Sequence, residues 1–294
     1  MPSGLSLGRP APSNPQRPGQ PRSQVMPSQA LNHQSQHSLS AWPRNLGPMS
    51  PLHDGLRLLE WLSDHPQPQG VTALATALGW PKSRVHRVLT ALVAAGYAAQ
   101  GPDRRYRATP QVLRLASGVM SSHPLRHLAL PVLRQASQAT GCDAILSVLH
   151  GDWSLAIAVD SPAGRLSDDP FGLLGRTAHL HAAANGKVLL AWLPLVEQRD
   201  LLERLPLPAL TPRTITDRAR LMEELEAVRS QGFAVNDREN HPETVTYSVP
   251  VFDGFHRTVA AFGLSQRPGT VDGEVVVAVL KKAAAGLTRG IAGV

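Results

Sequence analysis

Cysteine is nearly absent from this chain of 294 residues. Its single cysteine, Cys142, excludes an intrachain disulfide, and a lone thiol fits a reducing cytoplasm. Long apolar runs are also absent: no stretch of about 18 apolar residues predicts a membrane span. The N-terminus lacks the short apolar core of a signal peptide. We therefore expect a cytoplasmic protein, and the length allows two domains.

Acidic residues are missing from the first 50 positions, which hold nine prolines and four arginines. A segment rich in Pro, Ser and Gln cannot bury enough apolar surface to offset the entropy that it loses on ordering. We predict a disordered tail over residues 1–50. Met26 and Met49 leave open a later start of translation, and so whether this segment is translated at all.

Positive charge is concentrated near the N-terminus. Residues 51–122 carry eight Lys or Arg and four Asp or Glu, whereas residues 123–294 carry 17 and 18. The first 122 residues therefore carry the excess of positive charge, whereas the remainder is close to neutral within a formal net charge of +7 for the chain. A basic segment attracts polyanions, of which nucleic acid is the commonest, although a solvated basic surface gives the same count.

One stretch of this basic segment, Pro81 to Ala95, has the pattern of an amphipathic helix. Pro81 suits the first helical position, and Gly96 suits the left-handed position after the end. The apolar positions recur at the spacing of one buried face: Val85, Val88, Leu89 and Leu92. The opposite face supplies candidate DNA-binding residues: Lys82, Ser83, Arg84, His86, Arg87 and Thr90. Such a helix either lies in a DNA major groove or is an ordinary solvated helix.

The segment before this helix favours the first interpretation. Residues 52–64 and 72–78 predict two further helices, the second with Thr72 as its N-cap. Gly79 then makes a tight turn into the basic helix. Two helices joined in this way form a helix-turn-helix.

The segment after the basic helix predicts a hairpin. Residues 97–100 and 104–108 flank a Gly-Pro-Asp turn, which places a wing beside the helix-turn-helix. Three arginines of the wing are expected to contact phosphates: Arg104, Arg105 and Arg107. We assign the DNA-binding domain to residues 51–109. A linker helix, capped by Thr109, is expected over residues 110–123.

The remainder, residues 124–294, reads as an α+β domain. Helices are predicted over residues 125–140, within 180–190, over 218–230 after a cap at Thr216 or Asp217, and over 271–291. Strands are predicted over residues 143–150, 153–160, 233–237, 245–252 and 259–264. Paired strands with helices beside them indicate an antiparallel sheet that helices flank.

In these segments the chain resembles the IclR family of bacterial transcriptional regulators. The N-terminal resemblance rests on Leu74-Ala75, Leu78-Gly79, Pro81-Lys-Ser83, Val85-His-Arg87, Leu89, Leu92, Gly96-Tyr97, Tyr106-Arg107 and Leu113-Arg-Leu115. The C-terminal resemblance rests on Leu180-His-Ala182, Gly186-Lys187, Gly232-Phe-Ala234, Asn236-Asp237, Glu239 and Pro250-Val-Phe-Asp253. It implies a winged helix-turn-helix followed by a GAF/PAS-like effector domain.

The same resemblance implies a function and a ligand pocket. It implies a regulator that binds an operator in double-stranded DNA as a homodimer or homotetramer. A small organic effector, carboxylic or aromatic, would bind the C-terminal domain and change the affinity for DNA. The implied pocket residues are small or neutral and polar: Ala184, Asn185, Gly186, Asn236, Thr246, Gly263 and Ser265. The alternative for each is an ordinary residue of a turn or of the core edge.

This sequence departs from the family pattern at a few positions. Arg84 stands where relatives usually have Thr, which predicts an additional cation on the DNA-facing surface, so the operator preference of relatives does not transfer to this chain. Arg238 stands where relatives tend to carry an acid, so it either pairs with an anionic effector or faces water. The His241-Pro242 turn is also unusual.

Other classes of function have little support. His179 and His181 lie two apart and His241 could approach them, but a zinc site needs three or four ligands at fixed distances. No phosphate loop, nucleophile elbow or metal-hydrolase motif occurs, and the pair Asp168-Asp169 has no identifiable acid–base partner. We predict no catalytic residue, metal or cofactor. The alternative is an enzyme or small-molecule-binding protein with an accessory DNA-binding module.

Overall fold

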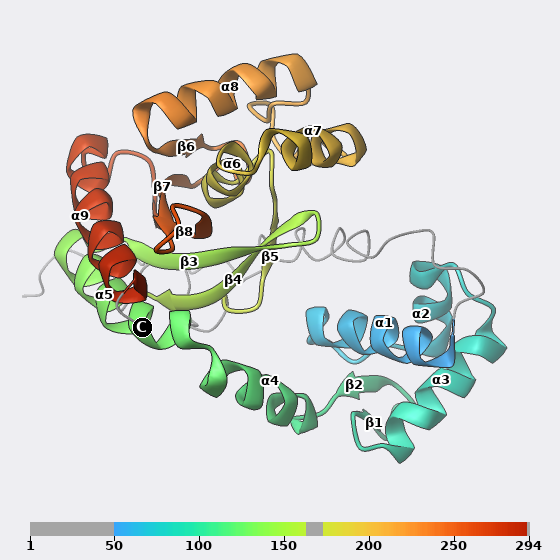
Figure 1. Ribbon diagram of the computed structural model, residues 1–294. Helices are drawn as coiled ribbons and strands as arrows, with labels where there is room; N and C mark the ends of the chain where they lie inside the picture. The colour runs from blue at the N-terminus through green and yellow to red at the C-terminus, as the bar shows by residue number, and fades with distance from the viewer. Residues whose placement is uncertain (1–49, 163–172, 293–294) are drawn as a thin grey trace, which may run out of the picture. The chain divides into compact units, whose positions relative to one another are not determined.

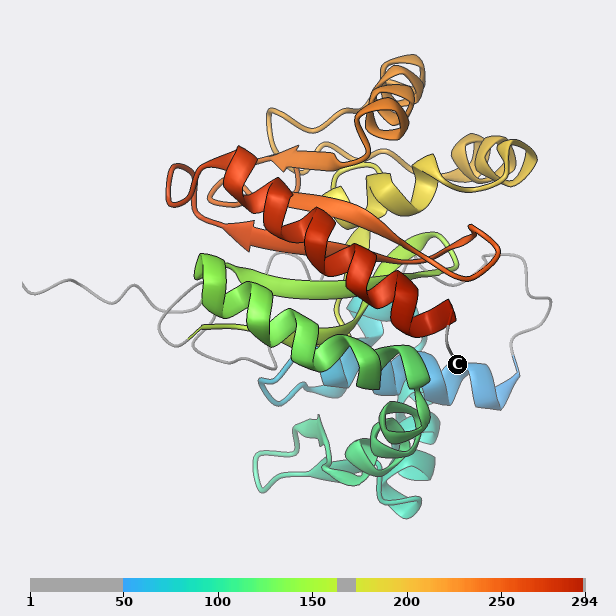
Figure 2. The ribbon, with the colours of Figure 1, turned by 60° about the vertical axis from the view of Figure 1, so that its left-hand side comes forward.

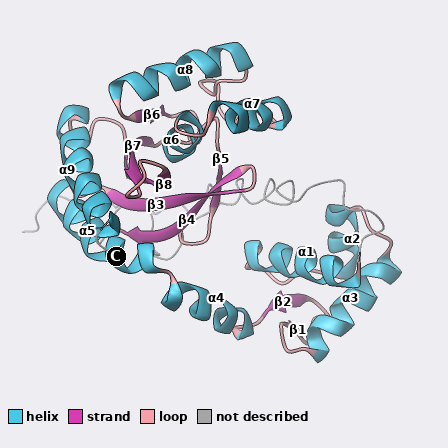
Figure 3. Cartoon of the chain, viewed as in Figure 1, coloured by secondary structure: helices cyan, strands magenta, loops and turns pink. Residues whose placement is uncertain are grey.

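The computed structural model describes residues 50–162 and 173–292 (Figure 1). The predicted tail over residues 1–50 lies, except for its last residue, outside the described residues, as does the pair Asp168-Asp169. The elements form an N-terminal group of three helices with a hairpin and a C-terminal group built on a larger sheet (Figure 3). Each group has its own hydrophobic core. None of the helices in the described ranges combines the length and apolarity that a membrane span requires.

The N-terminal group is a winged helix-turn-helix. It contains α1 (Pro51–Asp64), α2 (Val71–Leu78), α3 (Lys82–Ala94), β1 (Ala98–Gln100) and β2 (Tyr106–Ala108). The apolar faces of the helices and the inner face of the hairpin meet in one buried cluster: Leu58, Leu62, Leu74, Ala75, Leu78, Trp80, Val85, Val88, Leu89, Ala98 and Tyr106. The apolar spacing along α3 therefore serves this core, as the sequence predicted.

Glycines set the ends of the two central helices. Gly79 and Gly96 both adopt positive φ, 66° and 79°, which L side chains rarely tolerate. The prediction of Thr72 as an N-cap is wrong: α2 begins one residue earlier, after Gly70, and no side chain caps it. The sequence placed Pro81 at the first helical position. In the structure Pro81 is the N-cap residue, and α3 begins at Lys82.

The wing is a short antiparallel ladder that pairs Ala98 with Ala108 and Gln100 with Tyr106. Gln69, from the loop before α2, exchanges two backbone hydrogen bonds of 2.8 Å with Tyr106. These bonds attach the wing to the helical core on a second side. The arginines of the hairpin therefore project from a fixed backbone.

Two helices follow the wing. α4 (Gln111–Ser122) has no buried residue. The prediction of Thr109 as its cap is wrong, because Pro110 is the N-cap residue; Thr109 Oγ1 accepts a hydrogen bond of 3.3 Å from the backbone N–H of Gln111. α5 (Pro124–Thr140) begins after His123 and ends at Gly141, whose φ is 66°. The break at His123-Pro124 lies where the sequence predicted it.

The C-terminal group is built on a six-stranded antiparallel sheet of order β5-β4-β3-β8-β7-β6. Its strands are β3 (Asp143–His150), β4 (Trp153–Asp160), β5 (Thr177–His179), β6 (Ala234–Asp237), β7 (Val245–Phe252) and β8 (Thr258–Gln266). Its other helices are α6 (Ala184–Ala191), α7 (Leu195–Arg204), α8 (Arg218–Gln231) and α9 (Gly273–Ala292). Asp217 caps α8 by accepting from Arg220 N at 2.9 Å. The sequence did not predict β5 or α7.

The two faces of this sheet differ in character because successive side chains of a strand point to opposite sides. On β8, Phe262 and Leu264 belong to the core beneath α5 and α9, which lie side by side in Figure 2. The alternate positions of β8 face the other side: Ala261, Gly263 and Ser265. There Ala261 packs with residues of α6 and α8. The face next to α6 is thus lined by small and polar side chains.

Gly186 allows α6 to approach the segment that precedes it. A Cβ at this position would stand 2.5 Å from the Cα and the carbonyl oxygen of Leu180, which are backbone atoms and cannot rotate away. We expect Gly186→Ala to lower the free energy of unfolding by about 1–3 kcal/mol through overpacking. Chemical denaturation of the purified variant measures this change.

Gly286→Ala is the matched control, because its Cβ would enter open space on α9. Alanine is the better helix former, so this variant should be unchanged or more stable by up to about 1 kcal/mol. Equal stability of the two variants would contradict the close approach at Gly186.

Candidate functional site

The outer face of α3 presents five of its six predicted DNA-binding side chains to solvent. Lys82, Ser83, His86, Arg87 and Thr90 are all exposed. Behind them the buried side chains of Val85, Val88 and Leu89 hold the helix on the core. Thr90 Oγ1 donates to the carbonyl of His86 at 2.9 Å, so its hydroxyl is partly engaged within the helix.

Arg84 differs from these residues because its guanidinium binds inside the domain. Its Nε donates to Asp54 Oδ2 at 2.7 Å and its Nη2 to Asp54 Oδ1 at 2.5 Å. The hydrogen bond to Asp54 raises the pKa of Arg84 above its usual value, so the charge is permanent. The additional cation that the sequence predicts on the DNA-facing surface is thus paired with Asp54 of α1 in the structure.

The wing arginines are less constrained: among the described residues, their only ion pair is a long one between Arg105 and Asp103. Arg104, Arg105 and Arg107 are exposed, and Arg104 adopts a positive φ of 59° in the turn. Asp103 Oδ1 accepts from the backbone N–H of Arg105 at 3.1 Å and its carboxylate stands 3.8 Å from the guanidinium. An exposed pair at this distance is weak, so Arg105 can reach a phosphate at little cost.

The strand register places three predicted effector-binding residues next to one another. Asn236 of β6 lies opposite Thr246 of β7, which lies opposite Ser265 of β8. Thr246 Oγ1 donates to Ser265 Oγ at 2.9 Å. The row continues to Asp143 at the start of β3, a buried acid that the sequence analysis did not select.

The first turn of α6 faces the next row of the sheet. Ala184 and Asn185 are buried, and Asn185 Nδ2 donates to Ser147 Oγ of β3 at 2.8 Å. A Cβ on Gly263 would collide with Asn185 Oδ1, so this glycine is what lets the amide lie against β8. The side chain of Asn185 keeps an acceptor, Oδ1, without a partner among the described residues. The predicted set 184–186, 246, 263 and 265 thus gathers between α6 and one face of the sheet.

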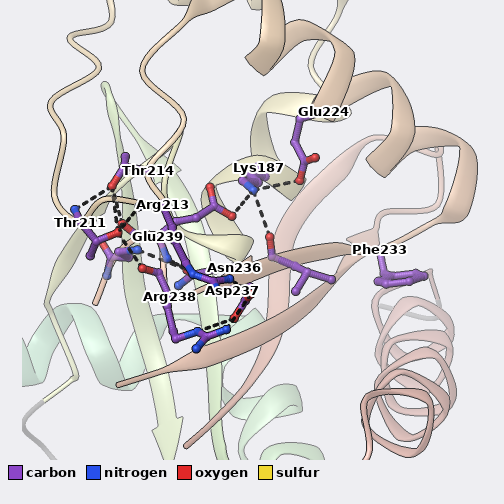
Figure 4. Close-up of polar contacts among 12 residues, drawn as sticks. Lys187, Thr211, Arg213, Thr214, Glu224, Phe233, Asn236, Asp237, Arg238 and Glu239 are labelled. Carbon is purple, nitrogen blue, oxygen red and sulfur yellow. Dashed lines mark hydrogen bonds and ion pairs between the residues drawn. The ribbon is translucent and has the colours of Figure 1, made fainter. Parts of the chain in front are cut away.

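Lys187 is the largest fully buried side chain in the described part of the chain, and sequence reasoning assigned it no role. Its Nζ donates to Glu239 Oε1 at 2.7 Å, to Glu224 Oε1 at 2.9 Å and to the carbonyl of Val235 at 3.0 Å (Figure 4). Burial raises the pKa of Glu239, and the Lys187 ammonium opposes that rise. The sequence signal that could have identified this buried lysine is its place directly before the apolar run of residues 188–191 in α6.

Asn236 has a structural role beside this lysine. Its Oδ1 accepts from the backbone N–H groups of Glu239 at 2.7 Å and of Asn240 at 3.2 Å. Thr214 Oγ1 donates to the carbonyl of Glu239 at 2.7 Å from the opposite side. These bonds fix the turn that carries Glu239, as Figure 4 shows.

Arg238 lies in this turn with a positive φ of 61°. Its Nε donates to Asp237 Oδ1 at 2.8 Å, and Asp237 also pairs with Arg213. The hydrogen bond from Arg238 lowers the pKa of Asp237. The sequence left two alternatives for Arg238, an anionic effector or solvent. The structure shows neither alternative directly, because Arg238 pairs with Asp237, the residue before it.

His179 and His181 were the histidines that the sequence placed two apart. His181 is fully buried, and its Nε2 lies 3.1 Å from the carbonyl of Pro208. Burial lowers its pKa below the usual value. The rings of His179 and His181 lie 5.5 Å apart. Within residues 50–162 and 173–292, no three His, Cys, Asp or Glu side chains form a group that could hold a metal ion.

The winged helix and the sheet domain define a class of protein, a DNA-binding regulator with a ligand-binding domain. Two family models match the chain: the IclR helix-turn-helix domain over residues 54–102 and the bacterial transcriptional regulator IclR C-terminal domain over residues 117–289. The chain belongs to the IclR family of bacterial transcriptional regulators. The resemblance and the fold class predicted from the sequence are confirmed.

Individual relatives agree with this assignment. The chain is 31% identical to the HTH-type transcriptional regulator XynR of Escherichia coli over 74% of this chain and 86% of that protein. The IclR transcriptional regulator of Alicyclobacillus acidocaldarius has a similar structure, with a TM-score of 0.70 and 27% identity over 81% of this chain and 97% of that chain. An IclR homologue from Microbacterium hydrocarbonoxydans, solved with 4-hydroxybenzoate, shares the fold at a TM-score of 0.69 and 23% identity, over 83% and 100% of the two chains.

Removal of the buried ammonium should be costly. We expect Lys187→Met to lower the free energy of unfolding by about 3–5 kcal/mol, because Glu239 then stays buried without its cation. Urea denaturation measures the loss. The double variant Lys187→Met/Glu239→Met should lose less than the single one, because the buried carboxylate is removed with its cation and the carboxylate that remains, Glu224, is 32% exposed.

Lys282→Met is the control for the chemistry of the substitution. Lys282 is exposed on α9, so its replacement should change stability by no more than about 0.5 kcal/mol. A Lys187→Met protein as stable as this control would show that the ion pairs contribute nothing.

Proposed function

We propose that α3 reads the operator in the major groove through Ser83, His86 and Arg87. Support comes from one observation above all: the exposed polar face of α3 is held on a rigid core and is followed by a basic hairpin. Residues near the start of a recognition helix are those that reach base edges. Arginine suits this role because two of its N–H donors can bind the O6 and N7 acceptors of guanine together.

The remaining exposed candidates contact the DNA backbone in this proposal. They are Lys82, Thr90, Arg104, Arg105 and Arg107. Phosphate contacts carry no sequence information but fix the position of the protein on the duplex. We leave Arg84 out of both groups because its guanidinium is already bound to Asp54 through two of its donors.

The regulator acts as a homodimer or homotetramer in this proposal. α4 has no buried residue, and its apolar side chains Leu113, Leu115 and Val119 are 68%, 56% and 65% exposed. A second copy of the same helix is a natural cover for such a stripe. A symmetric dimer prefers a pseudo-palindromic operator whose half-sites lie about one helical turn, or a multiple of it, apart.

A small organic acid or phenol is the effector in this proposal, bound between the first turn of α6 and the row Asn236, Thr246 and Ser265. Neutral hydroxyl and amide groups orient a ligand without demanding a charge, and the backbone N–H groups of Ala184 to Gly186 suit a carboxylate. The homologue solved with 4-hydroxybenzoate supports this class. The ligand changes DNA affinity through its different affinity for two arrangements, typically by about 1–3 kcal/mol.

Two arginine variants test the division between base and phosphate contacts. Arg87→Ala should weaken binding to the preferred sequence by about 1–3 kcal/mol and reduce discrimination. Arg105→Ala should weaken all sequences about equally and lower the salt slope by about 1. Fluorescence anisotropy measures both, with duplexes that the wild type selects from a randomised library and with unselected duplexes.

Arg220→Ala is the control, because Arg220 is exposed on α8 in the other domain. It should bind both duplexes like the wild type. The docking is wrong if Arg87→Ala and Arg105→Ala also do so, and the regulator function itself fails if the wild type shows no salt-sensitive DNA binding.

The effector site is tested by ligand-induced stabilisation. A panel of small carboxylates and phenols that includes 4-hydroxybenzoate should contain a compound that raises the Tm of the full-length protein. Thr246→Val removes one hydroxyl at nearly constant volume and should weaken that compound about two- to tenfold. Thr270→Val, on an exposed turn, should leave its affinity unchanged. Wild-type affinity in Thr246→Val would exclude this pocket.

A further inference from the structure

Four side chains join α1 to the start of α3. Asp54 and Arg57 come from α1, and Trp80 and Arg84 lie on either side of Pro81 at the start of α3. The Arg84 guanidinium stands 4.6 Å from the centroid of the Trp80 ring while it holds both oxygens of Asp54. Arg57 stands over the same ring at 5.7 Å. Trp80 itself belongs to the core of the domain.

The pair of Asp54 and Arg84 is asymmetric in its burial. The Asp54 side chain is 4% exposed and that of Arg84 is 28% exposed. A buried carboxylate without a cation is costly, so Asp54 holds the guanidinium in place. The bidentate geometry and the ring beneath it also fix the plane of the guanidinium. If the two donors that hold Asp54 turned to a base edge, a charge would be left buried on α1.

The contact between Arg84 and Asp54 holds the first turn of α3, because Arg84 lies in that turn. Arg84 is the third residue of α3, directly after Ser83 and one turn before Arg87, which is the main proposed base contact. Its backbone N–H and that of Val85 bond to the carbonyl of Pro81 at 3.0 and 3.2 Å, so the first turn is regular. A tether at Arg84 therefore sets the angle and rotation of the turn that enters the groove.

We propose that Asp54 and Arg84 form a clamp that orients α3 for sequence recognition, and that Arg84 is a positioning residue that does not read DNA. This inference rests on the DNA-binding function proposed above. It assigns to Asp54, on a helix that presents no proposed DNA contact, an effect on operator discrimination. It also explains how a cation is accommodated next to the reading surface without adding to the attraction for phosphates.

The decisive variant is Asp54→Asn, which leaves every proposed DNA contact in place. We expect specific affinity to fall about tenfold while affinity for unselected duplexes stays equal or rises, because the released Arg84 can reach a phosphate. The salt slope should then stay equal or steepen by about one unit. The probes are the duplexes selected by the wild type and unselected duplexes of the same length. Glu60→Gln, also on α1, controls for the loss of one negative charge and should bind like the wild type.

A second variant separates positioning from contact. Arg84→Gln should reduce specific affinity as much as Asp54→Asn, yet keep the wild-type salt slope, because no phosphate contact is lost. The double variant should lose no more than either single variant, since both break the same interaction. Library selection with Arg84→Gln should weaken preference across the half-site, whereas loss of a base contact would weaken it at one base pair.

The conservative pair Asp54→Glu/Arg84→Lys provides the rescue, because it keeps opposite charges at both positions. It should recover part of the discrimination lost by Arg84→Gln. Thermal unfolding of each variant ensures that binding is measured on folded protein, and the comparison of Asp54→Asn with Glu60→Gln carries the test if Arg84→Gln does not fold.

Two results would overturn the clamp. One is wild-type discrimination in Asp54→Asn together with a loss in Arg84→Gln, which would make Arg84 a direct reader. The other is additive losses in the double variant. Failure of the wild type to select any sequence would instead refute the proposed DNA-binding function, so the two failures are distinguishable.

Discussion

The buried ammonium of Lys187 is the interaction on which the effector domain depends. It ties α6 to Glu224 of α8, to the backbone of β6 and to Glu239 in the turn after β6. Lys187 directly follows the residues of α6 that face the sheet, and Asn236 fixes the turn that presents Glu239. Both sides of the proposed pocket are thus positioned by one charge, which is expensive to bury and cannot be left unpaired.

The DNA-binding domain uses the same device on a smaller scale. Asp54 holds Arg84, so the charge count of the N-terminal segment includes a cation that is already paired within the domain. The exposed cations of α3 and the wing remain, and they lie on backbone that is fixed by glycine-terminated helices and by the bridge from Gln69 to Tyr106. In each domain a cation that is paired inside the protein lies on the helix that carries proposed binding residues: Arg84 on α3 and Lys187 on α6.

Sequence patterns predicted most elements because their causes are local. The strands 143–150 and 153–160 and the hairpin turn between them follow from alternation and from Gly151-Asp152, and the structure has the same bounds. β5 was not predicted because three residues become a strand only by pairing with β4. The proposed cap at Thr72 failed because Gly70 opens α2, and a side chain one residue into a helix cannot cap it. The register that aligns Asn236, Thr246 and Ser265 also lies beyond any local pattern.

The sequence by itself determined the family, the winged helix and the residue types of both candidate sites, because periodicity, glycine positions and motif spacing are encoded along the chain. Only the tertiary structure decided which cations are available. Arg84 and Lys187 look like ordinary basic residues in the sequence, but their partners lie 30 residues away at Asp54 and 37 and 52 away at Glu224 and Glu239. An ion pair over such distances forms through packing of separate elements, and no spacing rule along one helix or strand predicts it.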